Sequence, residues 1–100
     1  MGGQAMQDLQ IAHVNEHGTY FVIVPVESSF GAQTRVAQEA AIDQLRLAAM
    51  SARLNGTVVP VWQDGNRLAF RAPQRFHGFF KSLSLPLVHS KLNATLSCHG

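Results

Sequence analysis

The chain has 100 residues, of which 46% are apolar and 14% are charged. A chain of this length forms a single domain. Its apolar content excludes an intrinsically disordered protein, which has few apolar residues and many charges. Its low charge content excludes a charged coiled coil. We therefore expect a compact domain with a neutral surface, formed by residues 7–100, behind a disordered tail of residues 1–6.

Charge is unevenly distributed along the chain, although the net charge is only +2. The first fifty residues contain two arginines and five carboxylates, whereas the last fifty contain six basic residues and a single aspartate. Such asymmetry is found in proteins that bind acidic partners or nucleic acid. It also suits two halves, or two copies, that attract each other.

The sequence has no feature that directs it to an oxidising compartment or to a membrane. Cys98 is the only cysteine, so no disulfide framework can form within the chain. The first ten residues, MGGQAMQDLQ, lack the basic and apolar regions of a signal peptide. No apolar run approaches the ~20 residues of a membrane span. We expect a cytoplasmic protein.

The first predicted unit is a β-hairpin. From Leu9 to Val14 the side chains alternate between two faces with the period of a strand, and residues 15–18 supply a turn that ends in glycine. Residues 20–26 are apolar on both faces and rich in β-branched side chains. This pattern is typical of a central strand that is covered on both sides for at least part of its length.

A long helix is predicted from about Gln33 to Leu54. At 100° per residue, one apolar stripe of this segment comes together on the helix surface and is widened by several alanines. We expect this stripe to face the sheet. Its centre consists of Val36, Ala40, Leu47 and Leu54, and it is widened by Ala37, Ala41, Leu45, Ala48 and Ala52. The pair Asn55-Gly56 predicts the end of the helix.

A second hairpin follows the helix. Residues 57–63 have the composition of a strand but contain Pro60, which cannot donate to a ladder and therefore predicts an edge strand or a bulge. Asp64-Gly65 is a strong hairpin turn, and residues 67–72 return as a strand with Leu68 and Phe70 on one face.

The last predicted elements are a short helix between Pro73 and Pro86 and a strand over residues 88–97. The whole order is then ββαββαβ. Without its first strand this is the order of the ferredoxin-like split βαβ unit. We therefore predict an α+β two-layer sandwich with a mostly antiparallel sheet, both helices on one face, and the opposite face open.

No motif in the sequence indicates catalysis or metal binding. His13 and His17 flank a turn, the other three histidines are dispersed, and no zinc-type ligand spacing is present. The pair Ser28-Ser29 lacks a GxSxG context, and each carboxylate is explained by a turn or a helix face. We expect a binding protein rather than an enzyme, with no catalytic residues, no metal and no cofactor.

The open sheet face is the predicted site. With Leu68 and Phe70 turned towards the helices, a basic strip beside an apolar centre is expected on the other side. The predicted binding residues are Tyr20, Arg67, Arg71, His89 and Lys91. Their role would be to receive an acidic group of a protein or small ligand. An exposed apolar sheet face needs a partner, and a second copy is the commonest one, so we expect a homodimer through Val22 and Val24.

Nucleic acid is the alternative partner. The strip Arg67/Arg71/Lys91, together with Lys81, could bind a phosphate backbone. An RNA-recognition motif proper is not expected, because the outward positions of the strand after the Asp64-Gly65 turn carry no stacking aromatic residue.

In size and layout the chain resembles the small orphan α+β proteins that bacterial mobile gene cassettes carry. The resemblance spans the whole chain as an arrangement of elements, and the distinctive stretches within it are residues 56–62 and 70–73. It implies a small α+β fold encoded on a bacterial mobile element. It assigns no activity and no functional residue.

Overall fold

The computed structural model describes residues 6–99, with side chains from 8 to 97, as an α+β fold. The strands are β1 (Met6–Glu16), β2 (Thr19–Pro25), β3 (Thr57–Asp64), β4 (Arg67–Phe70) and β5 (Ala94–His99). The helices are α1 (Arg35–Ser51), α2 (His77–Lys81) and α3 (Leu85–Ser90), with 3₁₀ turns at Ser28–Ala32 and Gln74–Phe76. Of the predicted tail, residues 1–5 lie outside the described residues, whereas Met6 already belongs to β1.

The sheet has the strand order β4-β3-β2-β1-β5. Both predicted hairpins are confirmed, since β1 pairs with β2 and β3 with β4 in antiparallel register. The ferredoxin-like order is wrong. In that unit a strand lies between the two parallel strands, whereas here β2 and β3 are direct parallel neighbours joined by α1. β1 has two partners, because its first half pairs with β5 and its second half with β2.

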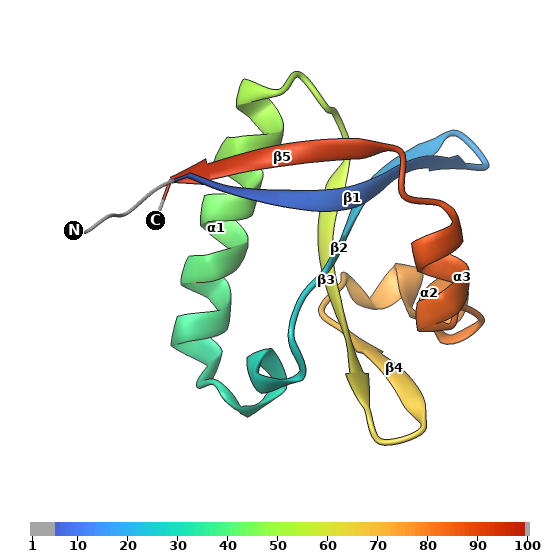
Figure 1. Ribbon diagram of the computed structural model, residues 1–100. Helices are drawn as coiled ribbons and strands as arrows, with labels where there is room; N and C mark the ends of the chain where they lie inside the picture. The colour runs from blue at the N-terminus through green and yellow to red at the C-terminus, as the bar shows by residue number, and fades with distance from the viewer. Residues whose placement is uncertain (1–5, 100) are drawn as a thin grey trace.

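Helices cover both faces of the sheet, so the prediction of a single helical layer and an open face is wrong. α1 lies on one side, and α2 and α3 lie on the other (Figure 1). The physical reason is the central strand β2, which is apolar on both faces and buried at four successive positions. Each face of such a strand needs its own apolar cover.

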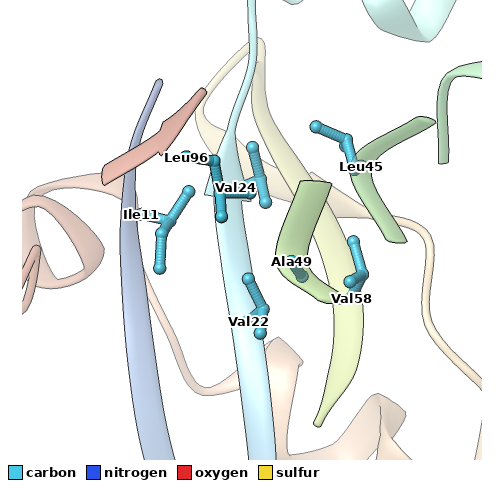
Figure 2. Close-up of a cluster of buried hydrophobic side chains, with 7 residues drawn as sticks. All are labelled: Ile11, Val22, Val24, Leu45, Ala49, Val58 and Leu96. Atoms are coloured by element: carbon cyan, nitrogen blue, oxygen red, sulfur yellow. The ribbon is translucent and has the colours of Figure 1, made fainter. Parts of the chain in front are cut away.

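The core under α1 contains the two valines that were assigned to a dimer interface. Val22 and Val24 are fully buried against Leu45 and Ala49 of α1 (Figure 2). Their assignment to an interface between copies is therefore wrong, because they are covered within their own chain. The other side chains of β2, Phe21 and Ile23, point to the second core, which contains Phe80 of α2 and Val88 of α3.

α1 begins at Thr34, whose hydroxyl accepts a hydrogen bond from the N–H of Ala37 over 3.1 Å. The helix is confirmed, but the face that it buries differs from the predicted stripe. The buried positions are Gln38, Ile42, Leu45 and Ala49. Of the predicted stripe, Leu45 is buried, and Ala41, Ala48 and Leu54 pack partly against the core. Val36 and Leu47 are exposed.

Pro60 lies in an interior strand, so the edge position predicted for residues 57–63 is wrong. The carbonyl of Pro60 accepts the N–H of Arg71, which places both backbone groups of this residue on the β4 side. β4 ends at Phe70, next to this point. The missing N–H of proline therefore falls where the ladder stops, and the pairing with β2 is not interrupted.

The predicted strand over residues 88–97 is wrong in its first half. Ser84 caps α3 through its hydroxyl, which accepts a hydrogen bond from Leu87, and Pro86 occupies the first turn. Pro86 therefore starts a helix instead of ending one. As a result His89 lies in the last turn of α3 and Lys91 just beyond it.

Candidate functional site

The five predicted binding residues do not form one surface. Tyr20 lies at the hairpin end of β2, where its ring stacks on His13 with a centroid distance of 5.3 Å. His89 lies in the last turn of α3 and Lys91 just beyond it, where Lys91 borders a small hollow with Val14 and Glu16 of β1. Strands β2 and β3 separate β1 from β4, which carries Arg67.

Arg71 follows the last residue of β4, and its side chain contacts residues of α1. Its guanidinium donates to the side-chain oxygen of the buried Gln38 over 2.7 Å and lies 3.7 Å from the carboxylate of Glu39. Gln38 in turn donates to the carbonyl of Phe30 over 2.9 Å. The guanidinium is thus part of a polar network beneath α1, and we assign Arg71 a structural role in place of the predicted binding role.

Replacing Arg71 by alanine is expected to destabilise the fold by about 1–3 kcal/mol, because the buried side-chain oxygen of Gln38 loses its donor. The control is Arg67→Ala, an exposed position where the change should stay within about 0.5 kcal/mol. Urea denaturation followed by circular dichroism measures both values. Equal effects of the two substitutions would contradict the structural role of Arg71.

A cleft of about 320 Å³ lies between α1 and the ends of β3 and β4. Its charged residues already neutralise one another: Arg46 contacts Asp43 at 2.8 Å, and Arg71 contacts Glu39 at 3.7 Å. A charged ligand in this cleft would have to break these pairs. The cleft is therefore a weak candidate for a binding site.

A larger groove of about 650 Å³ lies between the hairpin of β3 and β4 and the segment that joins α2 to α3, and we call it the β4 groove. Its base is apolar, with Leu68 and Phe70 from β4 and Leu83 and Leu85 from the segment that links and begins the last helices. Its polar residues are Gln63, Asn66, Arg67, Lys81 and Ser84. This volume is in the range of ordinary ligand sites, which is about 300–1,000 Å³.

The two cations of the β4 groove are available to a ligand. No carboxylate among the side chains of residues 8–97 lies within ion-pair distance of Arg67 or Lys81. Both side chains are exposed. Ser84 accepts a hydrogen bond from Leu87, so its hydroxyl hydrogen can still be donated. The groove therefore offers positive charge and donors above an apolar base.

β4 is also an edge strand of the sheet. Residues of an antiparallel pair alternate between bonding towards the partner strand and facing away from it. Because the N–H of Arg71 bonds to β3, the backbone groups of Leu68 and Phe70 face the free edge. Such an edge can accept another strand.

Within the described part of the chain, no three histidine, cysteine, aspartate or glutamate side chains lie close enough to hold a metal ion. None of the helices in residues 6–99 is both long and apolar enough to cross a membrane. Comparison with protein-family models, curated proteins and solved structures finds no significant match to this chain.

Of the predicted site, only Arg67 belongs to the β4 groove. Lys81, which sequence reasoning considered only for nucleic acid, is the second cation. The sequence did contain a signal for Lys81. The alternation of side chains in β4 correctly placed Leu68 and Phe70 towards the helices, and Lys81 lies in the predicted short helix, directly after Phe80.

Proposed function

We propose that this protein is a binding module that captures an acidic, extended segment of a partner protein in the β4 groove. The observation that carries the proposal is that Arg67 and Lys81, which have no ion-pair partner among the side chains of residues 8–97, border an apolar groove beside the edge strand β4. In this arrangement the partner adds a strand to β4. Its apolar side chains cover Leu68 and Phe70, and its carboxylates contact Lys81 on the same side of the sheet and Arg67, which alternates with Leu68 along β4, on the other side.

Three kinds of interaction support this mode of binding. Main-chain hydrogen bonds to the outward groups of Leu68 and Phe70 give affinity for any extended peptide. The apolar base can bury every second side chain of the peptide, because alternate side chains of an extended strand point to the same side. The positive charge excludes basic segments, because like charges brought together in an interface are strongly unfavourable. Specificity for acidic sequences then follows from Arg67 and Lys81.

The nucleic-acid alternative receives less support from the arrangement of the basic residues. Arg71 is bonded to Gln38 beneath α1, and Lys91 borders a hollow with β1 residues, away from the β4 groove. Arg67, Arg71 and Lys91, which would have to follow a phosphate backbone together, therefore lie in three separate places.

The test uses a fluorescein-labelled peptide in which valine and glutamate alternate, and a matched peptide in which lysine replaces glutamate. Fluorescence anisotropy should show binding of the acidic peptide alone. Arg67→Ala and Lys81→Ala should each raise its Kd about threefold to fivefold, the effect of ~0.7–1 kcal/mol for an exposed ionic contact. Lys91→Ala is the matched control and should leave the Kd unchanged.

Two outcomes would overturn the proposal. The first is a loss of affinity in Lys91→Ala as large as that in Lys81→Ala, since Lys91 lies outside the groove. The second is tighter binding of a labelled single-stranded oligonucleotide than of the acidic peptide, with affinity that falls steeply as salt is raised. That result would favour the nucleic-acid alternative.

A further inference from the structure

α1 carries a second apolar stripe that faces away from the sheet. Val36 is 77% exposed, Leu47 58% and Met50 71%, and the exposed Ala40 lies between them. These positions recur at intervals of three, four and seven residues, so they fall on one side of the helix. We call the four residues the outer stripe. Single exposed apolar residues are common, but four of them on one side of a helix, interrupted by Asp43, indicate an interaction surface.

We propose that two copies of this chain associate through the outer stripe, with their α1 helices antiparallel about a two-fold axis near the middle of the helix. The stripe is close to symmetric about that midpoint. Val36 of one copy then meets Met50 of the second, and Ala40 meets Leu47. The small side chain of Ala40 leaves room for Leu47, which allows close helix packing.

Charge decides the direction of the helices. Glu39 and Arg46 lie on the same flank of the outer stripe, and both side chains are 61% exposed. In an antiparallel pair this flank faces the same flank of the second copy, so that Glu39 of each copy approaches Arg46 of the other. In a parallel pair it would face Ala37 and Gln44, which carry no charge. Asp43 lies close to its counterpart in either arrangement, so it does not distinguish the two directions.

The same charges favour a second copy over a lipid surface. An interfacial helix has basic residues on its polar face, which contact anionic lipids. Here Glu39 lies on the flank and Asp43 lies within the outer stripe, where Arg46 neutralises it over 2.8 Å. Burial against another protein keeps this pair hydrogen-bonded, whereas insertion into hydrocarbon would desolvate it without compensation.

The first test is the solution mass by light scattering. The wild-type chain should have about twice the 10.9 kDa of one chain. Leu47→Glu should raise the dissociation constant of the dimer about 100-fold, because each of the two copies loses a buried leucine worth ~1.4 kcal/mol or more. The matched control is Leu87→Glu, which alters an exposed leucine of α3 and should leave the dimer intact. Thermal unfolding should confirm that both variants fold.

The second test is a charge exchange that probes direction. Glu39→Arg and Arg46→Glu should each weaken the dimer, by about threefold to tenfold, because each change creates two like-charge contacts. The double variant restores opposite charges across an antiparallel pair and should therefore dimerise more tightly than either single variant, although it loses the pairs of Arg46 with Asp43 and of Glu39 with Arg71 within each chain. It would not do so in a parallel pair.

Three results would overturn the proposal. They are a wild-type chain that stays monomeric at millimolar concentration, a Leu47→Glu variant that dimerises like the wild type, and a double charge variant as weak as either single one. The proposal is independent of the function of the β4 groove. Leu47→Glu monomers should still bind the acidic peptide, so failure of one proposal leaves the other intact.

Discussion

Replacing Phe21 by alanine is expected to lower the free energy of unfolding by about 3–5 kcal/mol. Phe21 is 2% exposed in the middle of β2. Its ring lies 4.8 Å from Phe76, 5.5 Å from Phe79 and 5.2 Å from Phe80, measured between ring centroids. One substitution therefore removes contacts to three aromatic residues of the segment that contains α2. A loss of this size is a large part of the ~5–15 kcal/mol that stabilises an ordinary domain.

The neighbouring residue gives the control for this prediction. Tyr20 is another aromatic residue of the same strand, but its ring is 40% exposed on the opposite face and contacts His13. Tyr20→Ala should destabilise by about 1 kcal/mol. Both values come from urea unfolding monitored by circular dichroism and tryptophan fluorescence. If the two variants were equally stable, Phe21 would not be a centre of the second core.

Gly56→Ala is expected to destabilise the fold by at least about 3 kcal/mol. Gly56 has a φ of +131°, a backbone conformation that residues other than glycine rarely adopt. A Cβ atom at this position would lie 2.6 Å from the carbonyl oxygen of Tyr20. That oxygen belongs to the backbone of β2, so the contact cannot be relieved by a side-chain rotation. The parallel pairing of β2 and β3 would have to shift.

Two other glycines separate the conformational part of this effect from the steric part. Gly65 also has a positive φ, +62°, but a Cβ there meets nothing within 4 Å. Gly65→Ala should therefore cost only about 1–2 kcal/mol. Gly78 lies in α2 with open space around it, and Gly78→Ala should stabilise by up to about 1 kcal/mol. Thermal unfolding of the three variants should give this order, and a Gly56→Ala variant as stable as Gly65→Ala would contradict the close approach.

Local patterns predicted the elements of this fold better than their arrangement. The alternation after Leu9 and the turn Asp64-Gly65 predicted both hairpins. The segment that forms α1 was also found, but its buried side was predicted only in part, because Leu45 is buried whereas Val36 and Leu47 are exposed. The reason is that α1 has two apolar stripes, and the choice between them depends on Gln38. This polar residue can be buried because Phe30 and Arg71, distant in sequence, satisfy its amide.

Prolines were the main source of error at the local level. Pro60 was taken to mark an edge and Pro86 to end a helix, whereas the first lies in an interior strand and the second lies in the first turn of α3. In each case the structural effect of the proline depends on a neighbouring feature of the fold. For Pro60 it is the point where β4 stops, and for Pro86 it is the cap that Ser84 provides.

The candidate site depended on these arrangements, which explains why sequence reasoning recovered only Arg67 of the β4 groove. Arg71 and Lys91 look equivalent to Arg67 in the sequence. Packing distinguishes them, since Arg71 is held by Gln38 and Lys91 follows a helix that was predicted to be a strand. The wrong assignment of Val22 and Val24 has the same origin, because a layer of helices on one face leaves the other face apparently open.

The division of β1 between two partners has a consequence for the order of folding. Its second half needs only the adjacent β2, whereas its first half needs β5, and the bond from Ser97 to Asp8 spans 89 positions of the sequence. Contacts this distant form slowly, because a long loop must close before they contribute. During synthesis, β1 is therefore held at one end by its hairpin while its other end presents bare backbone donors and acceptors. Until β5 has emerged, this half-strand of the nascent chain is exposed to pairing with a neighbouring copy.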